Sequence, residues 1–189
     1  MPPVRTGFVA LLVLTCAAAA GAQTREDVIL AVGVGSTSPS SDSLDASLTI
    51  SPSVHVRTGT GWMPMAGASW FDYDTPFLHI RMVPVMAGIA YRMTSGRVWL
   101  APGVAAGYSF NRARITIDPA QRITLENSFV WRPGMAIGYD ATERVSIGGS
   151  AGYLVSRSTL DFGNTRGSPP SRFDADGLVL TLELGIRPF

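Results

Sequence analysis

The sequence predicts an all-β fold, an eight-stranded antiparallel up-and-down transmembrane β-barrel with short turns at one end and longer loops at the other. Apolar and polar side chains alternate over eight extended stretches between Val28 and Phe189. The links between these stretches are alternately short and long, and a segment resembling a secretion signal precedes them. A period of two is a property of strands, because successive strand side chains point to opposite faces.

The first three stretches alternate plainly. Val28–Gly35 and Leu48–Arg57 each place apolar side chains on one face, namely Val28, Leu30, Val32 and Val34 in the first and Leu48, Ile50, Pro52, Val54 and Val56 in the second. The third stretch, Thr60–Phe71, has Trp62 and Trp70 near its ends. We expect the apolar face of each strand to contact lipid, because only half of a barrel strand does so.

The fourth stretch, Leu78–Met93, has an ambiguous phase. If its first apolar residues face lipid, Leu78, Ile80 and Met82 point outward while His79 and Arg81 point inward. The same phase turns the apolar residues after Pro84 inward. We therefore expect either a bulge near Pro84 or a partly apolar interior at this strand.

The remaining stretches are Val98–Phe110, Phe129–Asp140, Arg144–Ser156 and Leu178–Phe189. Their expected lipid faces include Val98, Leu100, Val104, Tyr108 and Phe110, then Phe129, Trp131, Met135, Ile137 and Tyr139, then Leu178, Leu180, Leu182, Leu184 and Ile186. Two similar segments, Pro102–Tyr108 and Pro133–Tyr139, carry glycines on the inward face. A narrow eight-stranded barrel needs small residues there beside bulky ones.

The links support this topology. Three are short, namely Thr58-Gly59, Thr94-Ser95-Gly96 and Ala141-Thr142-Glu143, and four are longer, namely Ser36–Ser47, Asp72–Phe77, Asn111–Ser128 and Arg157–Gly177. In the third long link we expect a hairpin over Ile115–Leu125 that continues the flanking strands, with a bulge at Asn111–Arg114. Aromatic residues lie near both ends of the stretches, as expected of rings at membrane surfaces.

Residues 1–22 are interpreted as a cleaved signal peptide and residues 23–189 as the barrel domain. A continuous apolar run, Phe8–Ala19, is followed by Ala20-Gly21-Ala22, a small-residue site for signal peptidase. Cys16 raises the alternative of a lipid anchor, but Thr15 before it does not fit the small residue expected there. With Cys16 removed, the mature chain has no thiol.

Composition excludes several classes of protein. The whole chain has 15 Lys+Arg and 14 Asp+Glu, and this near-neutral balance argues against a nucleic-acid partner. After residue 22 there is no apolar run long enough for a helix that spans a membrane.

Together these features resemble the small eight-stranded outer-membrane barrel family typified by the OmpA membrane domain and OmpX. The resemblance covers Val28–Phe189. It implies periplasmic turns, external loops, and a location in the outer membrane of a Gram-negative envelope, with membrane lipid, lipopolysaccharide and the barrel-assembly machinery as partners of a monomer. It also implies that the aromatic Phe189 is the assembly signal, although Pro188 and the phase of the preceding leucines depart from the usual ending.

Charged residues on expected inward faces form the candidate site, a polar network in the lumen consisting of Arg57, Arg81, Arg132, Glu183 and Arg187. We interpret it as a plug that fills a barrel too narrow to conduct; a gated path for small anions is the alternative. In the loops, Arg112 and Arg114 are candidates for contact with lipopolysaccharide phosphate.

No catalytic, cofactor or metal site is predicted. Gly148-Gly149-Ser150-Ala151-Gly152 matches a nucleophile elbow in letters, but it lies inside a predicted strand and no His follows it. The chain is therefore interpreted as a non-enzymatic protein with a structural or surface-interaction role, in which the Ile115–Leu125 hairpin meets partners. The alternatives are a narrow channel for small or hydrophobic solutes, an enzyme that modifies lipid A, and a soluble barrel of lipocalin type with the faces inverted.

Overall fold

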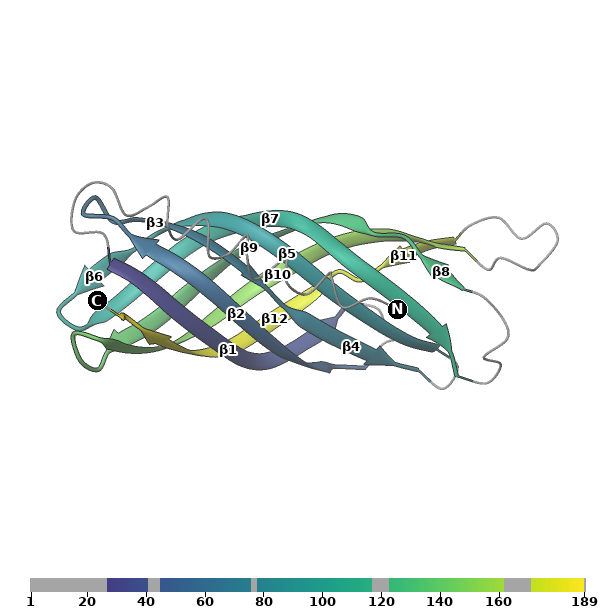
Figure 1. The fold of residues 1–189 in the computed structure, drawn as a ribbon, viewed down its shortest axis with the longest axis horizontal. Helices are drawn as coiled ribbons and strands as arrows, with labels where there is room; N and C mark the ends of the chain where they lie inside the picture. The colour runs from purple at the N-terminus through teal and green to yellow at the C-terminus, as the bar shows by residue number, and fades with distance from the viewer. Residues whose placement is uncertain (1–26, 41–44, 76–77, 117–122, 162–170, 189) are drawn as a thin grey trace.

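The computed structural model is a closed antiparallel β-barrel (Figure 1). It describes residues 27–40, 45–75, 78–116, 123–161 and 171–188, so that the predicted signal peptide and Phe189 lie outside the described residues. Its strands are β1 (Asp27–Pro39), β2 (Ser47–Arg57), β3 (Trp62–Ala68), β4 (Trp70–Asp74), β5 (Leu78–Tyr91), β6 (Met93–Ser95), β7 (Val98–Ile115), β8 (Thr124–Leu125), β9 (Ser128–Asp140), β10 (Val145–Asp161), β11 (Ser171–Asp174) and β12 (Gly177–Ile186).

The wall consists of eight strands, because two of them are each divided into two segments by proline. β3 and β4 pair with β5 in one register, and Ser69 between them donates its amide to the Pro84 carbonyl at 3.0 Å. Pro84 has no amide hydrogen to return the bond. In the same way β5 and β6 share one register on β7, and the break at Arg92 lies beside Pro102.

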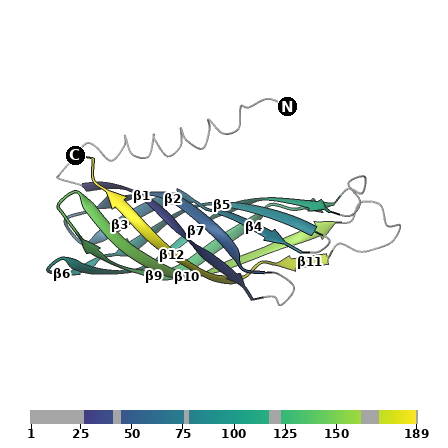
Figure 2. The ribbon, with the colours of Figure 1, turned by 90° about the horizontal axis from the view of Figure 1, so that it is seen from below.

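Each strand pairs with its neighbours in sequence, and β1 pairs with β12 to close the barrel, as both views show (Figures 1 and 2). The predicted fold class is thus confirmed. We call the end with the links 58–61, 96–97 and 141–144 the turn end, and the opposite end the loop end. Among the described residues, no helix is long and apolar enough to span a membrane.

Two predictions about the loop end are wrong. The link expected as Asp72–Phe77 is short, because residues 75–77 alone separate β4 from β5. The bulge expected at Asn111–Arg114 is absent, since β7 pairs with β5 without interruption from Ile115 to Gly103. Residues 117–122 of the expected Ile115–Leu125 hairpin lie outside the described residues; at its far end, β8 pairs with β10. β10 extends to Asp161 and offers β8 a free edge beyond the start of β9.

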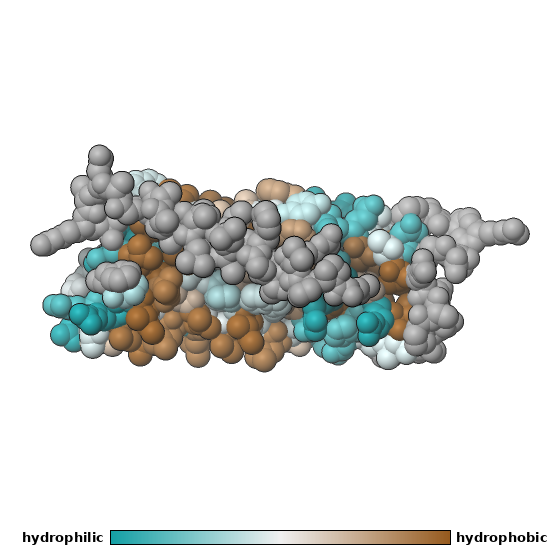
Figure 3. All heavy atoms as spheres, in the orientation of Figure 1, coloured by the Kyte–Doolittle hydropathy of each residue, from teal (hydrophilic) through white to brown (hydrophobic). Residues whose placement is uncertain are grey.

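The outer surface carries the apolar faces that alternation predicts. Leu30, Val34, Ile50, Val104, Phe129, Ile137, Leu178 and Leu182 are all exposed, as are the aromatic residues Trp62, Tyr91 and Tyr139 toward the turn end and Trp70, Tyr108, Phe110 and Trp131 toward the loop end. Where grey atoms do not cover the surface, Figure 3 shows hydrophobic residues in a belt with hydrophilic residues toward both ends. Such an apolar belt between polar ends matches a membrane.

The structure corrects the phase of the fourth strand. In β5, Ile80 and Met82 are fully buried inside the barrel, and Arg81 points outward with its side chain 54% exposed. The residues after Pro84 keep this phase, with Ile89 and Tyr91 outward, so neither a bulge nor an inward run is needed. What changes along β5 is the surrounding solvent: apolar residues face outward within the belt and inward beyond it.

The barrel beyond the belt is packed like a soluble protein. We call its buried side chains the apolar cap; they are Phe71, Tyr73, Ile80, Met82, Val130 and Leu154. Partly buried Leu78, Ala113, Ile123 and Phe173 pack against the same core. The cap fills the loop end of the lumen, because burial of apolar surface is favourable wherever the outer face meets water.

Candidate functional site

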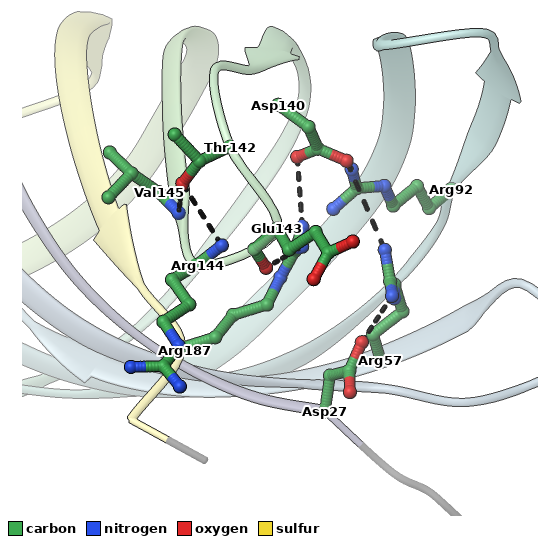
Figure 4. A network of polar contacts seen from close by, with 9 residues as sticks. All are labelled: Asp27, Arg57, Arg92, Asp140, Thr142, Glu143, Arg144, Val145 and Arg187. Carbon is green, nitrogen blue, oxygen red and sulfur yellow. Dashed lines mark hydrogen bonds and ion pairs between the residues drawn. The ribbon is translucent and has the colours of Figure 1, made fainter.

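Charged side chains close the turn end of the lumen in a cluster that we call the ionic layer (Figure 4). It consists of Asp27, Arg57, Arg92, Asp140 and Arg187. Asp140 is its centre: one carboxylate oxygen accepts a bond of 2.7 Å from Arg92, and the other accepts 2.9 Å from Arg187. Arg57 pairs with Asp27 and lies 4.0 Å from Asp140.

Strand ends bring these residues together. Arg57 ends β2, Asp140 ends β9, and Arg187 follows β12, so all three reach the same rim of the barrel. Arg187 also donates to the carbonyl of Glu143 at 2.6 Å, which fastens the 141–144 turn over the opening. Three guanidinium groups face two carboxylates, and the side chain of Arg92 is only 2% exposed. Buried charges are tolerated when they are paired in this way.

Trp99 packs against Arg92 of the ionic layer. The guanidinium carbon of Arg92 is 4.7 Å from the centroid of its ring, a cation–π distance. The ring fits because Gly138 and Gly148 have no side chains: a Cβ on Gly138 would lie 2.2 Å from Trp99 Cζ2. The inward glycines that the repeat predicts are therefore confirmed, and this one makes room for an indole.

Between the ionic layer and the apolar cap lies a cavity of about 100 Å³, which we call the central cavity. His55, Arg132 and Glu183 line it. Glu183 Oε1 accepts hydrogen bonds from Ser150 (2.9 Å) and Thr181 (3.1 Å), and His55 Nε2 lies 2.8 Å from the hydroxyl of Ser53. No ion pair joins Arg132 to Glu183 in the described structure, so the cavity has both charges and open space.

Four of the five residues predicted for the lumen network face inward, but they form two groups. Arg57 and Arg187 belong to the ionic layer, whereas Arg132 and Glu183 line the central cavity. The prediction for Arg81 is wrong. Its Nε donates to Asp72 at 2.7 Å on the outer surface, and that hydrogen bond, with the charge of Asp72, raises the pKa of Arg81.

Sequence reasoning missed Asp27, Arg92, Trp99 and Asp140. Alternation gives a usable signal for three of them. Arg92 follows the outward Tyr91, and Asp140 follows the outward Tyr139, so alternation alone turns both inward. For Trp99 the same alternation from outward Val98 applies, but nothing in the sequence pairs its ring with Arg92.

The other candidate residues, Arg112 and Arg114, lie on the outer surface at the loop end of β7, two and four residues beyond outward Phe110. Within the described structure, neither forms an ion pair. Across the ladder, Arg112 faces Arg81 and Arg114 faces His79, but Asp72 and Asp74 already hold those two side chains. Within the described structure both guanidinium groups are thus unpaired, on the loop-end side of the exposed rings of Tyr108 and Phe110.

The lumen contains no recognisable catalytic set among the residues described. Ser150 lies within β10, which continues as a strand, and its hydroxyl is bound to Glu183 and Thr181. A nucleophile elbow requires a turn into a helix. The described residues also contain no group of three or more His, Cys, Asp or Glu side chains suited to a metal ion. What the interior offers is a cavity lined by charged and polar side chains between the ionic layer and the apolar cap.

The sequence matches the family model described as outer membrane protein beta-barrel domain over residues 7–187. A search of curated proteins finds no match. Similar solved structures include the outer membrane protein OprG from Pseudomonas aeruginosa, with 11% identity and a TM-score of 0.58, covering 88% of this chain and 97% of that one. Neisserial surface protein A matches with 13% identity and a TM-score of 0.58, over 86% of this chain and 96% of that one. The E. coli outer membrane protein W matches with 11% identity and a TM-score of 0.56, over 88% and 100%.

Proposed function

Because the chain belongs to the outer membrane protein β-barrel domain family, we propose that it is a non-enzymatic, monomeric barrel with a sealed interior that stabilises the envelope and binds lipopolysaccharide. The observation that carries the proposal is the closure of the lumen from both sides. The ionic layer closes the turn end and the apolar cap fills the loop end, with about 100 Å³ of space between them. An eight-stranded barrel has an interior just wide enough for side chains to fill.

The family is one of the outer membrane. Since barrels of this membrane have short periplasmic turns and longer external loops, we infer that the turn end is periplasmic and the loop end is external. We infer that residues 1–22 direct export and are cleaved, and that the barrel-assembly machinery inserts the mature chain. Intact mass of the protein from outer-membrane fractions tests the first point. A mass corresponding to a chain that begins at Gln23 supports it, and a chain that begins with a lipid-modified Cys16 contradicts it.

Planar-bilayer recording tests the sealed interior. We expect no steady conductance from the wild-type protein, because the paired, buried side chains of Arg92 and Arg187 occupy the turn end of the lumen. A steady conductance would instead favour the second candidate, a narrow channel for small or hydrophobic solutes. The excess of guanidinium over carboxylate groups in the ionic layer, together with Arg132 in the central cavity, would then make the channel selective for anions.

The proposed lipopolysaccharide contact rests on Arg112 and Arg114. These side chains project from the outer surface on the loop-end side of Tyr108 and Phe110. The rings of Tyr108 and Phe110 pack edge to face, with their centroids 5.8 Å apart. Guanidinium groups bind phosphate strongly, and both residues lie on the loop-end side of the aromatic residues, where a lipid headgroup would meet them. We expect the double variant R112A/R114A to retain less lipopolysaccharide on purification, whereas R97A/R144A, with two exposed arginines removed at the turn end, retains the wild-type amount. Equal retention in both variants would refute this contact.

An enzyme that modifies lipid A remains testable in the same cells. The proposal expects the mass spectrum of lipid A to be unchanged by expression of the protein. A new lipid A species that disappears in a variant of the central cavity, such as Glu183→Gln, would overturn the non-enzymatic assignment.

A further inference from the structure

One wall of the central cavity is rich in sulfur. Met63, Met65 and Met86 line this cavity together with His55. Met63 is 3% exposed and Met86 is 6% exposed, so these thioethers are turned away from lipid. Neither the sealed-lumen proposal nor the ionic layer accounts for this combination of side chains.

The strand register places these four residues next to one another. Met65 pairs directly with His55 across β2 and β3. Met63 precedes Met65 by two residues on the same face of β3. Met86 on β5 pairs with Gly67, the next inward position after Met65. Opposite and diagonal positions of neighbouring strands are within side-chain reach, so Met65 can meet His55 together with Met63. Met63 and Met86 flank Met65 on opposite sides, too far apart along the strand for one ion to contact both.

Methionine is a common filler of irregular cores, and this use would explain buried thioethers. Methionine side chains that only fill a core, however, leave no open cavity beside them. Here flexible methionine side chains surround a cavity that stays open, and a polar imidazole points into it beside them. The aromatic ring of Trp99 packs in the same cluster as Met63 and Met65, so that a π system lies beside the thioethers.

From this geometry we propose that the central cavity is a binding site for a soft monovalent cation, Cu(I) or its analogue Ag(I), with Met63, Met65 and His55 as the ligands. Thioether sulfur selects soft metals, whereas magnesium, calcium and manganese prefer oxygen. The charge also fits. Arg132 and Glu183, both at the cavity, balance each other, so that the cation adds a single positive charge, and a divalent ion would be more costly to desolvate.

The test uses the full chain with Cys16→Ser, because a retained thiol would itself bind Cu(I). Folded protein in detergent is titrated with Cu(I) under anaerobic conditions against a Cu(I) chelator, and with Ag(I) by calorimetry. A second series adds the cation during refolding, because the ionic layer closes the route to the cavity. We expect one equivalent to be retained and X-ray absorption of the copper to show sulfur neighbours.

The double variant M63L/M65L keeps side-chain volume but loses two ligands, and we expect its affinity to fall at least about tenfold. Met93→Leu, the same substitution at an exposed position away from the cavity, is the matched control and should bind as the wild type does. Heat-modifiable gel mobility verifies that each variant is folded. His55→Phe is a second variant, and its copper should lose the nitrogen contribution in the absorption spectrum.

Three results would overturn the site. The first is no retained cation in either titration series, and the second is undiminished Cu(I) binding by folded M63L/M65L. The third is a preference for Zn²⁺ that depends on Glu183, which would indicate a site of oxygen and nitrogen ligands. None of these results affects the conductance or lipopolysaccharide experiments, so the metal site and the proposed function fail separately.

Discussion

The carboxylate of Asp140 accepts a hydrogen bond of 2.7 Å from the guanidinium of Arg92, two residues that lie 48 positions apart in the chain. The contact ties the end of β9 to the break between β5 and β6, and these strands are the two neighbours of β7. It also holds the guanidinium that lies over the ring of Trp99. The integrity of the ionic layer therefore depends on one carboxylate.

Asp140→Asn should destabilise the barrel strongly. The substitution leaves Arg92 and Arg187 buried against a neutral amide, and removing one partner of a buried pair costs about 3–5 kcal/mol. Urea unfolding in liposomes, followed by tryptophan fluorescence, measures the change. The control is Asp174→Asn, which removes an exposed pair with Arg172 and should cost less than about 1 kcal/mol. Equal effects of the two substitutions would show that the layer does not stabilise the fold.

Gly138→Ala should destabilise the barrel because the new methyl group collides with Trp99. The added Cβ would lie 2.2 Å from the ring, and overpacking of this kind costs about 1–3 kcal/mol. Gly59→Ala is the control, since nothing lies within 4 Å of its added Cβ. In the double variant with Trp99→Leu the penalty should shrink, and a double-mutant cycle measures this coupling. Additive penalties would contradict a collision with the indole.

Because the outer surface meets lipid in the belt and water beyond it, two outward positions should differ in how well they tolerate a charged side chain. Leu182→Arg places a charge on the 77% exposed apolar side chain in the middle of β12 and should cost about 2–4 kcal/mol. Arg81→Leu, beyond the belt, removes an exposed ion pair and should change stability little. Unfolding in liposomes measures both, and a well-tolerated Leu182→Arg would place the belt elsewhere.

Phe189→Ala should reduce assembly into the outer membrane if this aromatic residue is the assembly signal. We expect less folded, heat-modifiable barrel in outer-membrane fractions, while refolding of purified protein in detergent stays unchanged. Pro188→Ala serves as the neighbouring control. An equal loss in refolding would indicate a structural role for Phe189.

Alternation identified the strands because the period of two does not depend on how the side chains pack in the folded barrel. Leu48 and Leu182 lie outward, and Thr49 and Thr181 inward, as their positions in the pattern require. The inward placement of Arg57, Arg132, Glu183 and Arg187 follows in the same way, since a charge on the lipid face is costly. The pattern could not group these four residues, because grouping depends on barrel curvature and on the stagger between distant strands.

Arg81 shows where the local pattern fails. Alternation cannot show whether the outward side chains of a strand segment meet lipid or water. Ile80 and Met82 give the same alternating pattern whether they face lipid or the barrel interior. The depth of the position decides, and depth is set by the length and register of all eight strands. The same holds for β8, whose pairing with β10 depends on how far β10 extends past β9.

Strand number, direction and the lipid-facing side of the belt were thus encoded locally, since each depends on neighbours one or two residues apart. The ionic layer, the seat of Trp99 on Gly138, the methionine wall of the cavity and the inverted packing at the loop end were not. The ionic layer joins strands from both ends of the sequence, and the other features depend on the register between neighbouring strands. Each therefore required the assembled barrel, in which register and curvature bring those side chains to one depth.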